Sequence, residues 1–253
     1  MNILCVGNSF AVDVSTYVHQ IAKTNGIDIN ICVLYIGGCP IDLHWKNFLS
    51  KEKAYDFYIN GEPKLRCDIF EGLSYMEWDY ITFQQRSGDS GDASTFFPEL
   101  TKLMEGIREY SKAKYLLHMT WSYGKDYSHE KYGSNPLDQA AMSADIRRAY
   151  LSVSDVSGIK YIIPSGFAID LARKKYGDVL NRDGFHLNEL ARVLTGLLWV
   201  HYFTGKKLDV SKYHSTGYSY DDVTPPVKDE LLPELDEIAL KAIDMNRGHN
   251  LHD

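Results

Sequence analysis

Two polar stretches, far apart in the chain, carry side chains that could do covalent chemistry. Ser9 follows a short apolar run at residues 3–6 and the dipeptide Gly7-Asn8. A hydroxyl at the carboxyl end of a parallel strand lies where open α/β sheets bind ligands, although turn chemistry alone also selects Gly-Asn-Ser. The second stretch, DGFHLN at residues 183–188, places a carboxylate three residues before an imidazole. Such a pair can activate a serine, because the imidazole accepts the hydroxyl proton and the carboxylate fixes its tautomer.

These two stretches also resemble known motifs. GNSF after the first strand and DGFHLN before a long apolar helix resemble the first and last motif blocks of the SGNH/GDSL-type serine esterases. That family has a Ser near the N-terminus, a Gly after the second strand, an Asn after the third and D-x-x-H near the C-terminus. Ser9, Gly38, Asp183 and His186 match this pattern in type and order. The resemblance spans roughly residues 1–205, and DGFHLN is its most specific part.

The resemblance implies hydrolysis through an acyl-enzyme. Ser9 would attack an ester carbonyl, His186 would take the serine proton, and Asp183 would hold the imidazole. The backbone N–H groups of Ser9 and Gly38 would bind the oxyanion, since glycines at a strand end let backbone donors approach a ligand.

The third block departs from the family pattern. Gln84-Gln85 follows the strand at residues 80–83 where the family has Asn, and Asn8 replaces the Asp of the GDS signature. A glutamine amide is an equivalent donor that is one methylene longer. We therefore expect Gln84, with Gln85 as the alternative, to complete the oxyanion hole.

Apolar runs that read as strands lie at about residues 3–6, 28–36, 80–83, 114–120 and 160–163, and helical patterns alternate with them. The helical patterns include residues 95–111, 137–154, 167–175 and 188–203, and Asp13 is expected to cap the first helix. This alternation predicts an α/β fold, a three-layer doubly wound parallel five-stranded sheet with the flavodoxin-like order 2-1-3-4-5, of the SGNH hydrolase type.

The chain divides into two regions in this interpretation. Residues 1–205 form an SGNH-like hydrolase domain with an excursion from the sheet at about 41–78, where Asn60-Gly61 predicts a hairpin turn. Residues 206–253 form a C-terminal appendage packed on the same domain. It ends in a helix that has Pro233 in its first turn.

Composition narrows the function classes. The 253 residues carry a formal net charge of −7 and are 44% hydrophobic, which favours one full core and argues against nucleic-acid binding. No apolar run is long enough to insert in a membrane, and we expect a cytoplasmic protein as the chain stands, unless a signal peptide has been removed. No ligand spacing indicates a metal or an organic cofactor. Oligomeric state is not readable.

The four cysteines favour buried free thiols, because they lack C-x-x-C spacing. Cys39 is the exception, since it follows Gly37-Gly38 and could act as a nucleophile if His186 lay within reach. An α/β-hydrolase is disfavoured, because its serine elbow follows several strands. The alternative from another class is a catalytically silent SGNH-like or flavodoxin-like binding module for a sugar or a phosphate-containing ligand.

The expected partner is a small-molecule ester, and the resemblance implies an O-acetyl group on a sugar. Aromatic residues near the predicted edge, Trp45, Trp121 and Tyr123, could stack on a sugar ring or belong to the core. Asp42 and His44 could line the same pocket.

Overall fold

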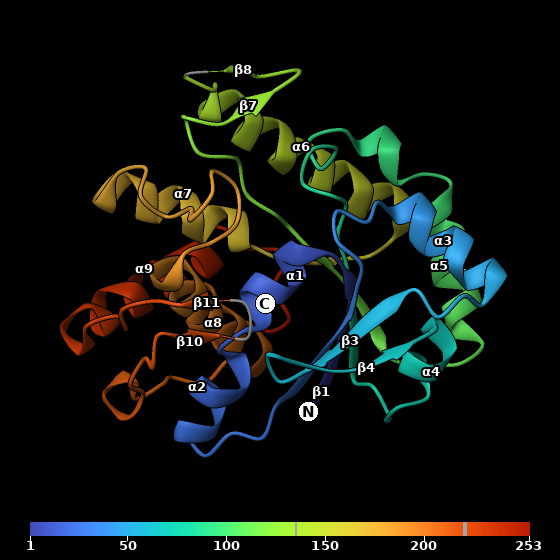
Figure 1. Ribbon diagram of the computed structural model, residues 1–253, viewed down its shortest axis with the longest axis horizontal. Coiled ribbons are helices and arrows are strands. Elements are labelled where there is room, and N and C mark those ends of the chain that lie inside the picture. Colours follow the sequence, from blue (N-terminus) through green and yellow to red (C-terminus); the bar gives the residue numbers. More distant parts are fainter. Residues whose placement is uncertain (135, 220–221) are drawn as a thin grey trace.

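The computed structural model describes residues 1–134, 136–219 and 222–253, which are built around a seven-stranded sheet (Figure 1). The strands lie in the order β4 (Glu62–Cys67), β3 (Tyr55–Ile59), β2 (Asn30–Tyr35), β1 (Asn2–Gly7), β5 (Tyr80–Phe83), β6 (Lys114–His118) and β9 (Tyr161–Ile163). Strands β2, β1, β5, β6 and β9 pair in parallel. β3 pairs antiparallel with β2, and β4 pairs antiparallel with β3. The α/β class is confirmed, but the sheet has seven strands rather than five.

The two additional strands come from the region that we expected to leave the sheet. β3 and β4 form a hairpin with Asn60 and Gly61 at its turn, where φ is 53° and 89°. The Asn-Gly turn signal is therefore confirmed. Because β3 pairs with β2, the hairpin extends the sheet instead of departing from it. The edge strand β4 exposes most of its side chains, so its residues lack the alternation that identifies a half-buried strand.

Helices cover both faces of the sheet (Figure 1). One layer holds α1 (Ser9–Ser15), α2 (Val18–Thr24), α7 (Ser165–Tyr176), α8 (Glu189–Thr204) and α9 (Leu232–Asp244). The other layer holds α3 (Ile41–Ser50), α4 (Ile69–Leu73), α5 (Glu99–Arg108) and α6 (Gln139–Ser157). The short elements are η1 (Ala93–Phe96), β7 (Ser128–His129), β8 (Gly133–Ser134), η2 (Val210–Lys212), β10 (Tyr218–Ser219), β11 (Asp222–Val223) and η3 (Asp229–Leu231).

The turn between β1 and α1 differs from its prediction. Asn8, not Asp13, caps the first helix, because the Asn8 side chain accepts a hydrogen bond from the Phe10 N–H. Asp13 lies inside α1 and is buried. The helix therefore begins at Ser9, which places the serine in the first turn, where backbone N–H groups have no intrahelical partner.

The helix expected over residues 95–111 is broken near its start. Residues Ala93–Phe96 form a 3₁₀ turn, Phe97 is extended, and α5 begins only after Pro98. The physical reason is Pro98, since a proline disfavours the helical conformation of the residue before it.

The C-terminal region packs on the same layers. α9 contacts α7 and α8, and Pro233 lies in its first turn as predicted. Beyond α9 the chain runs along the outer side of β9, where the Ile162 N–H donates to the His249 carbonyl and the Asn246 amide donates to the Ile162 carbonyl. These bonds satisfy backbone groups of an edge strand that would otherwise be open to pairing with another chain.

Candidate active site

The structure brings Ser9, His186 and Asp183 into one hydrogen-bonded line. The Ser9 Oγ lies 2.8 Å from the His186 Nε2, although the two residues are 177 positions apart. The His186 Nδ1 lies 2.6 Å from the Asp183 Oδ2. A carboxylate can only accept, so the Nδ1 carries the proton and the Nε2 is free to accept from the serine. This is the arrangement in which an imidazole can act as a general base.

Asp183 is also held by the backbone of its own loop. Its Oδ1 accepts from the His186 N–H at 2.9 Å and from the Phe185 N–H at 3.3 Å. Partial burial raises the pKa of Asp183, but the hydrogen bonds from the side chain and backbone of His186 outweigh it, and the pKa lies below its usual value. The carboxylate therefore stays ionised opposite the imidazole.

A buried ion cluster anchors this loop to the helix that carries Ser9. The Asp13 carboxylate accepts from the Arg192 Nη2 at 2.7 Å, from the Arg182 Nη1 at 2.9 Å and from the Leu187 N–H at 2.8 Å. Asp13 and Arg192 are almost fully buried. Because Asp13 lies one helical turn after Ser9 and Leu187 follows His186, the cluster fixes the approach of the imidazole to the hydroxyl. Sequence reasoning missed this role and assigned Asp13 to a helix cap.

The glycine loop after β2 lies beside the serine. Gly38 is exposed and has a φ of +60°, which favours glycine. The loop is tied to the turn that bears Ser9, because the Asn8 Nδ2 donates to the Cys39 carbonyl at 3.2 Å. Among the described residues, the N–H groups of Ser9 and Gly38 find no acceptor.

Gln84 and Gln85 lie next to this turn, but their amides are engaged elsewhere. The Gln84 Nε2 donates to the Asn8 Oδ1 at 2.7 Å. The Gln85 Nε2 donates to the Thr95 carbonyl at 2.7 Å, and its Oε1 accepts from the Ile41 N–H at 3.0 Å. Both side chains are buried, with 1% exposure. Neither amide is presented to an oxyanion beside Ser9, contrary to our expectation, because the longer side chain reaches a partner inside the protein.

The cysteine interpretation finds no support in the geometry. Cys39 is fully buried, its Sγ faces the Pro40 carbonyl, and burial raises the pKa of its thiol to about 12. The thiol is therefore protonated at neutral pH and is a poor nucleophile. The other cysteines, Cys5, Cys32 and Cys67, are also buried and free.

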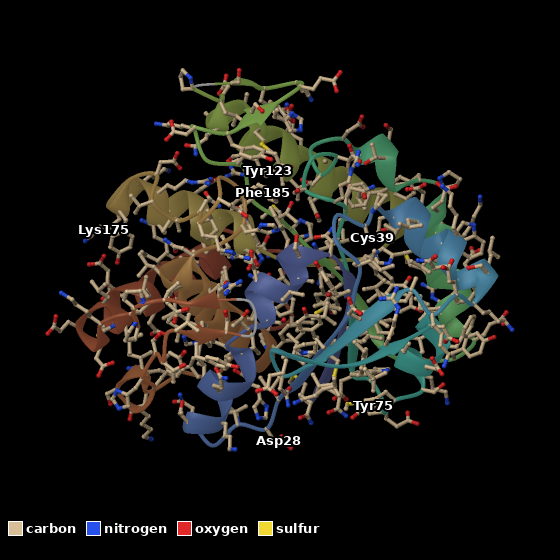
Figure 2. All side chains as sticks on the ribbon, viewed as in Figure 1. Asp28, Cys39, Tyr75, Tyr123, Lys175 and Phe185 are labelled. Carbon is tan, nitrogen blue, oxygen red and sulfur yellow. The ribbon has the colours of Figure 1, made fainter. Side chains whose placement is uncertain are left out.

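The aromatic residues expected near the site differ in their placement. Trp121 is a core residue, because its ring stacks on Phe10 at a centroid distance of 4.0 Å and is 1% exposed. Trp45 stacks on Phe48, its neighbour on α3. Tyr123 lies beside Phe185, at 5.5 Å between ring centroids (Figure 2). Trp121 also meets the loop that carries His186, because its Nε1 donates to the Phe185 carbonyl at 2.8 Å, whereas Trp45 packs within α3.

Two polar residues expected in the pocket are also engaged elsewhere. His44 belongs to α3 and is completely buried, its ring stacks on Tyr55, and burial lowers the pKa of its imidazole to about 3. Asp42 pairs with Lys46 at 2.7 Å on the exposed side of α3. From the sequence, His44 could line the substrate pocket or lie at the surface, but its side chain faces the core.

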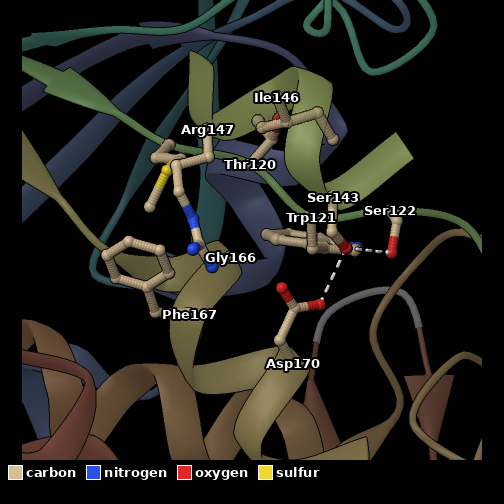
Figure 3. Close-up of a pocket in the computed structure, with 10 residues that line it drawn as sticks. Thr120, Trp121, Ser122, Ser143, Ile146, Arg147, Gly166, Phe167 and Asp170 are labelled. Carbon is tan, nitrogen blue, oxygen red and sulfur yellow. Dashed lines mark hydrogen bonds between the residues drawn. The ribbon is translucent and has the colours of Figure 1, made fainter. Parts of the chain in front are cut away.

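A separate small pocket lies between α6 and α7 (Figure 3). The Ser143 hydroxyl bridges Ser122 and Asp170 there, at 3.0 and 2.9 Å, and burial raises the pKa of Asp170. The pocket is about 10 Å³ in volume and opens beside a cleft of about 640 Å³. Trp121 lines the pocket but Ser9 does not, so it is distinct from the candidate site.

Within residues 1–134, 136–219 and 222–253, no three His, Cys, Asp or Glu side chains are grouped so that they could hold a metal ion. In the same ranges, every helix is too short or too polar to cross a membrane.

The fold is similar to that of a solved protein described as an SGNH hydrolase. A protein from Slackia heliotrinireducens described as a candidate SGNH hydrolase superposes with a TM-score of 0.54 at 17% identity, over 79% of this chain and 97% of that chain. The chain belongs to the family described as Domain of unknown function (DUF4886), whose model matches residues 2–221.

A crystal structure of a member of that family supports the same assignment. The DUF4886 family protein from Bacteroides uniformis ATCC 8492 is 30% identical, with a TM-score of 0.80, over 96% of this chain and 92% of that chain. A comparison with curated proteins found no match to this sequence.

Proposed function

We propose that this protein is a serine hydrolase that cleaves small esters. The observation that carries the proposal is the continuous line from the Ser9 Oγ through His186 to Asp183, with separations of 2.8 and 2.6 Å. A serine hydroxyl is a weak nucleophile until a neutral imidazole accepts its proton, and this line supplies the imidazole in the required tautomer.

The reaction proceeds in two halves. His186 takes the Ser9 proton while the oxygen attacks the ester carbonyl, and the oxyanion is held by the N–H groups of Ser9 and Gly38. The tetrahedral intermediate expels the alcohol, which receives the proton from His186. A water then gives its proton to His186 and attacks the acyl-enzyme, and the carboxylic acid leaves as the Ser9 hydroxyl re-forms. Asp183 stabilises the imidazolium that exists between these transfers.

We further propose an O-acetylated sugar as the substrate. Phe185 adjoins His186 at 4.1 Å between ring centroids, and Tyr127 lies 5.1 Å from Phe185. Both rings belong to the side of the site next to the imidazole, and Tyr127 is 36% exposed. Aromatic faces of this kind bind the apolar faces of sugar rings.

Hydrolysis of a short-chain aryl acetate tests the activity. We expect the purified protein to turn over, and Ser9→Ala and His186→Ala to lose activity by a factor on the order of 10⁴ or more. Ser152→Ala and His214→Ala are matched controls, since both residues are exposed, and these variants should retain full activity. Equal activity in all five proteins, or none in any, would contradict the hydrolase proposal. A panel of acetylated sugars then tests the substrate class.

A further inference from the structure

A row of polar side chains runs through the interior directly beneath the nucleophile. Asn8 follows β1, Gln84 follows β5 and His118 ends β6, and these three strands are neighbours in the sheet. The His118 Nδ1 lies 2.6 Å from the Gln84 Oε1, and the Gln84 Nε2 lies 2.7 Å from the Asn8 Oδ1. All three residues are buried, with exposure of 2% or less.

The direction of these hydrogen bonds is fixed from the backbone end. The Asn8 Oδ1 faces the Phe10 N–H, which can only donate, and the Asn8 Nδ2 faces the Cys39 carbonyl, which can only accept. Asn8 therefore has one possible amide orientation. It presents an oxygen to Gln84, so Gln84 must donate with its nitrogen and present its own oxygen to His118. The His118 Nδ1 then has to carry the proton.

Close packing leaves this row little freedom. A side chain at Gly7 would bring its Cβ within 3.3 Å of the Gln84 amide, so the glycine allows Gln84 to lie against the end of β1. Among the described residues, the His118 Nε2 has no hydrogen-bond partner. A buried polar atom without a hydrogen-bond partner destabilises the folded state. The Nδ1 is thus the only atom of His118 that bonds to another side chain here.

Asn8 connects the two donors that the proposed mechanism needs. Its Oδ1 caps α1, which begins with the N–H of Ser9, and its Nδ2 holds the Cys39 carbonyl, one residue after Gly38. A rotation of the Asn8 amide would disturb both the cap of α1 and the hydrogen bond to the Cys39 carbonyl. The separation of the two oxyanion donors consequently depends on Asn8, and Asn8 depends on Gln84.

We propose that His118 and Gln84 are positioning residues, which act through Asn8 to set the oxyanion hole formed by Ser9 and Gly38. Gln84 stands where the SGNH/GDSL-type esterases have their third-block Asn, but in this inference it acts through Asn8 and does not contact the oxyanion. The inference rests on the proposed ester hydrolysis, since it assigns these residues to the same site.

Two nearly isosteric variants at position 118 provide the test. His118→Asn keeps a donor close to the place of the Nδ1, whereas His118→Leu removes it, and the two side chains have the same branched shape and number of non-hydrogen atoms. With the aryl acetate, we expect kcat of His118→Leu to fall on the order of 10- to 100-fold below that of His118→Asn, with a similar KM. The unfolding midpoint of each variant is measured alongside, and kcat is compared at a temperature where both variants are folded.

The outcomes separate this inference from the proposed function. Equal kcat values in the two variants, with an active wild type, would overturn the positioning role and leave the hydrolase intact. A wild type that cleaves no ester would overturn both. If His118→Leu does not fold, Gln84→Met replaces it, since it removes both hydrogen bonds at similar volume. The same loss in kcat is expected for Gln84→Met, and wild-type kcat in that variant would refute the inference.

Discussion

Replacing Asp13 by alanine should destabilise the protein far more than the loss of an ordinary ion pair. Asp13 has an exposure of 1% and Arg192 one of 2%, so the substitution takes a carboxylate away from a guanidinium in the interior. The Arg192 Nη1 bond to the Ser219 hydroxyl, at 2.7 Å, is to a neutral group and does not replace the charge of the Asp13 carboxylate. Breaking one side of a buried pair costs about 3–5 kcal/mol.

Asp42→Ala is the matched control for this experiment. It makes the same change in a pair whose partners, Asp42 and Lys46, are 44% and 68% exposed. Pairs of that kind contribute about 0–1 kcal/mol. The measurement is the free energy of unfolding from denaturant titration of both variants and wild type. In thermal scans, Asp13→Ala should lower the midpoint on the order of 10 °C, because about 1 kcal/mol corresponds to a few degrees at this size.

The same variant should lose activity even where it is folded. Without Asp13, the Leu187 N–H loses its acceptor, the Arg182 guanidinium loses one of its acceptors, and the loop bearing His186 loses these bonds to α1. We expect kcat on the aryl acetate to fall about 100-fold at a temperature where circular dichroism shows native helix content. A loss below about 1 kcal/mol, equal to that of Asp42→Ala, would refute the reasoning, as would wild-type kcat.

Three further predictions follow from the site. Asp183→Asn should lower kcat roughly 10³- to 10⁴-fold with little change in fold, because the amide can select the wrong imidazole tautomer, and the exposed Asp209→Asn should leave kcat unchanged. The hydrogen bonds to Asp183 lower its pKa in the folded state, so they stabilise the fold above the ordinary pKa of about 3.9, and this stability is lost as the pH falls through the lowered value. Denaturant titrations from pH 7 to pH 3 should therefore show a larger loss of unfolding free energy for wild type than for Asp183→Asn. Equal losses in the two proteins would contradict this role of Asp183. Iodoacetamide at pH 7 should neither modify Cys39 nor inhibit the enzyme, because burial raises the pKa of that thiol to about 12, and rapid inactivation with alkylation there would contradict this.

The parts of the fold that were predictable are those with long, uninterrupted patterns. α8 was expected at residues 188–203 and spans Glu189–Thr204, because nearly every side chain of this helix is buried and its cap, Asn188, precedes it. The hairpin strands β3 and β4 were missed for the opposite reason. β4 is the edge strand, where polar side chains meet solvent and periodicity is weak, and β3 beside it is a run of only five residues.

The site shows a similar division between local and distant information. Asp183 and His186 are three residues apart, so their contact could be inferred from one loop. The partners of Asp13 and Gln84 lie 179 and 34 positions away, in Arg192 and His118, and no local pattern records them. One signal was available for the second pair, since polar residues end three strands that were expected to be parallel.

The central claim, an activated serine at position 9, is tested most directly by intact-protein mass measurement after reaction with a fluorophosphonate. The account predicts one adduct on wild type, located at Ser9 by peptide mapping, no adduct on Ser9→Ala, and strongly slowed labelling of His186→Ala. An unlabelled but folded wild type, or an adduct that persists in Ser9→Ala, would contradict it.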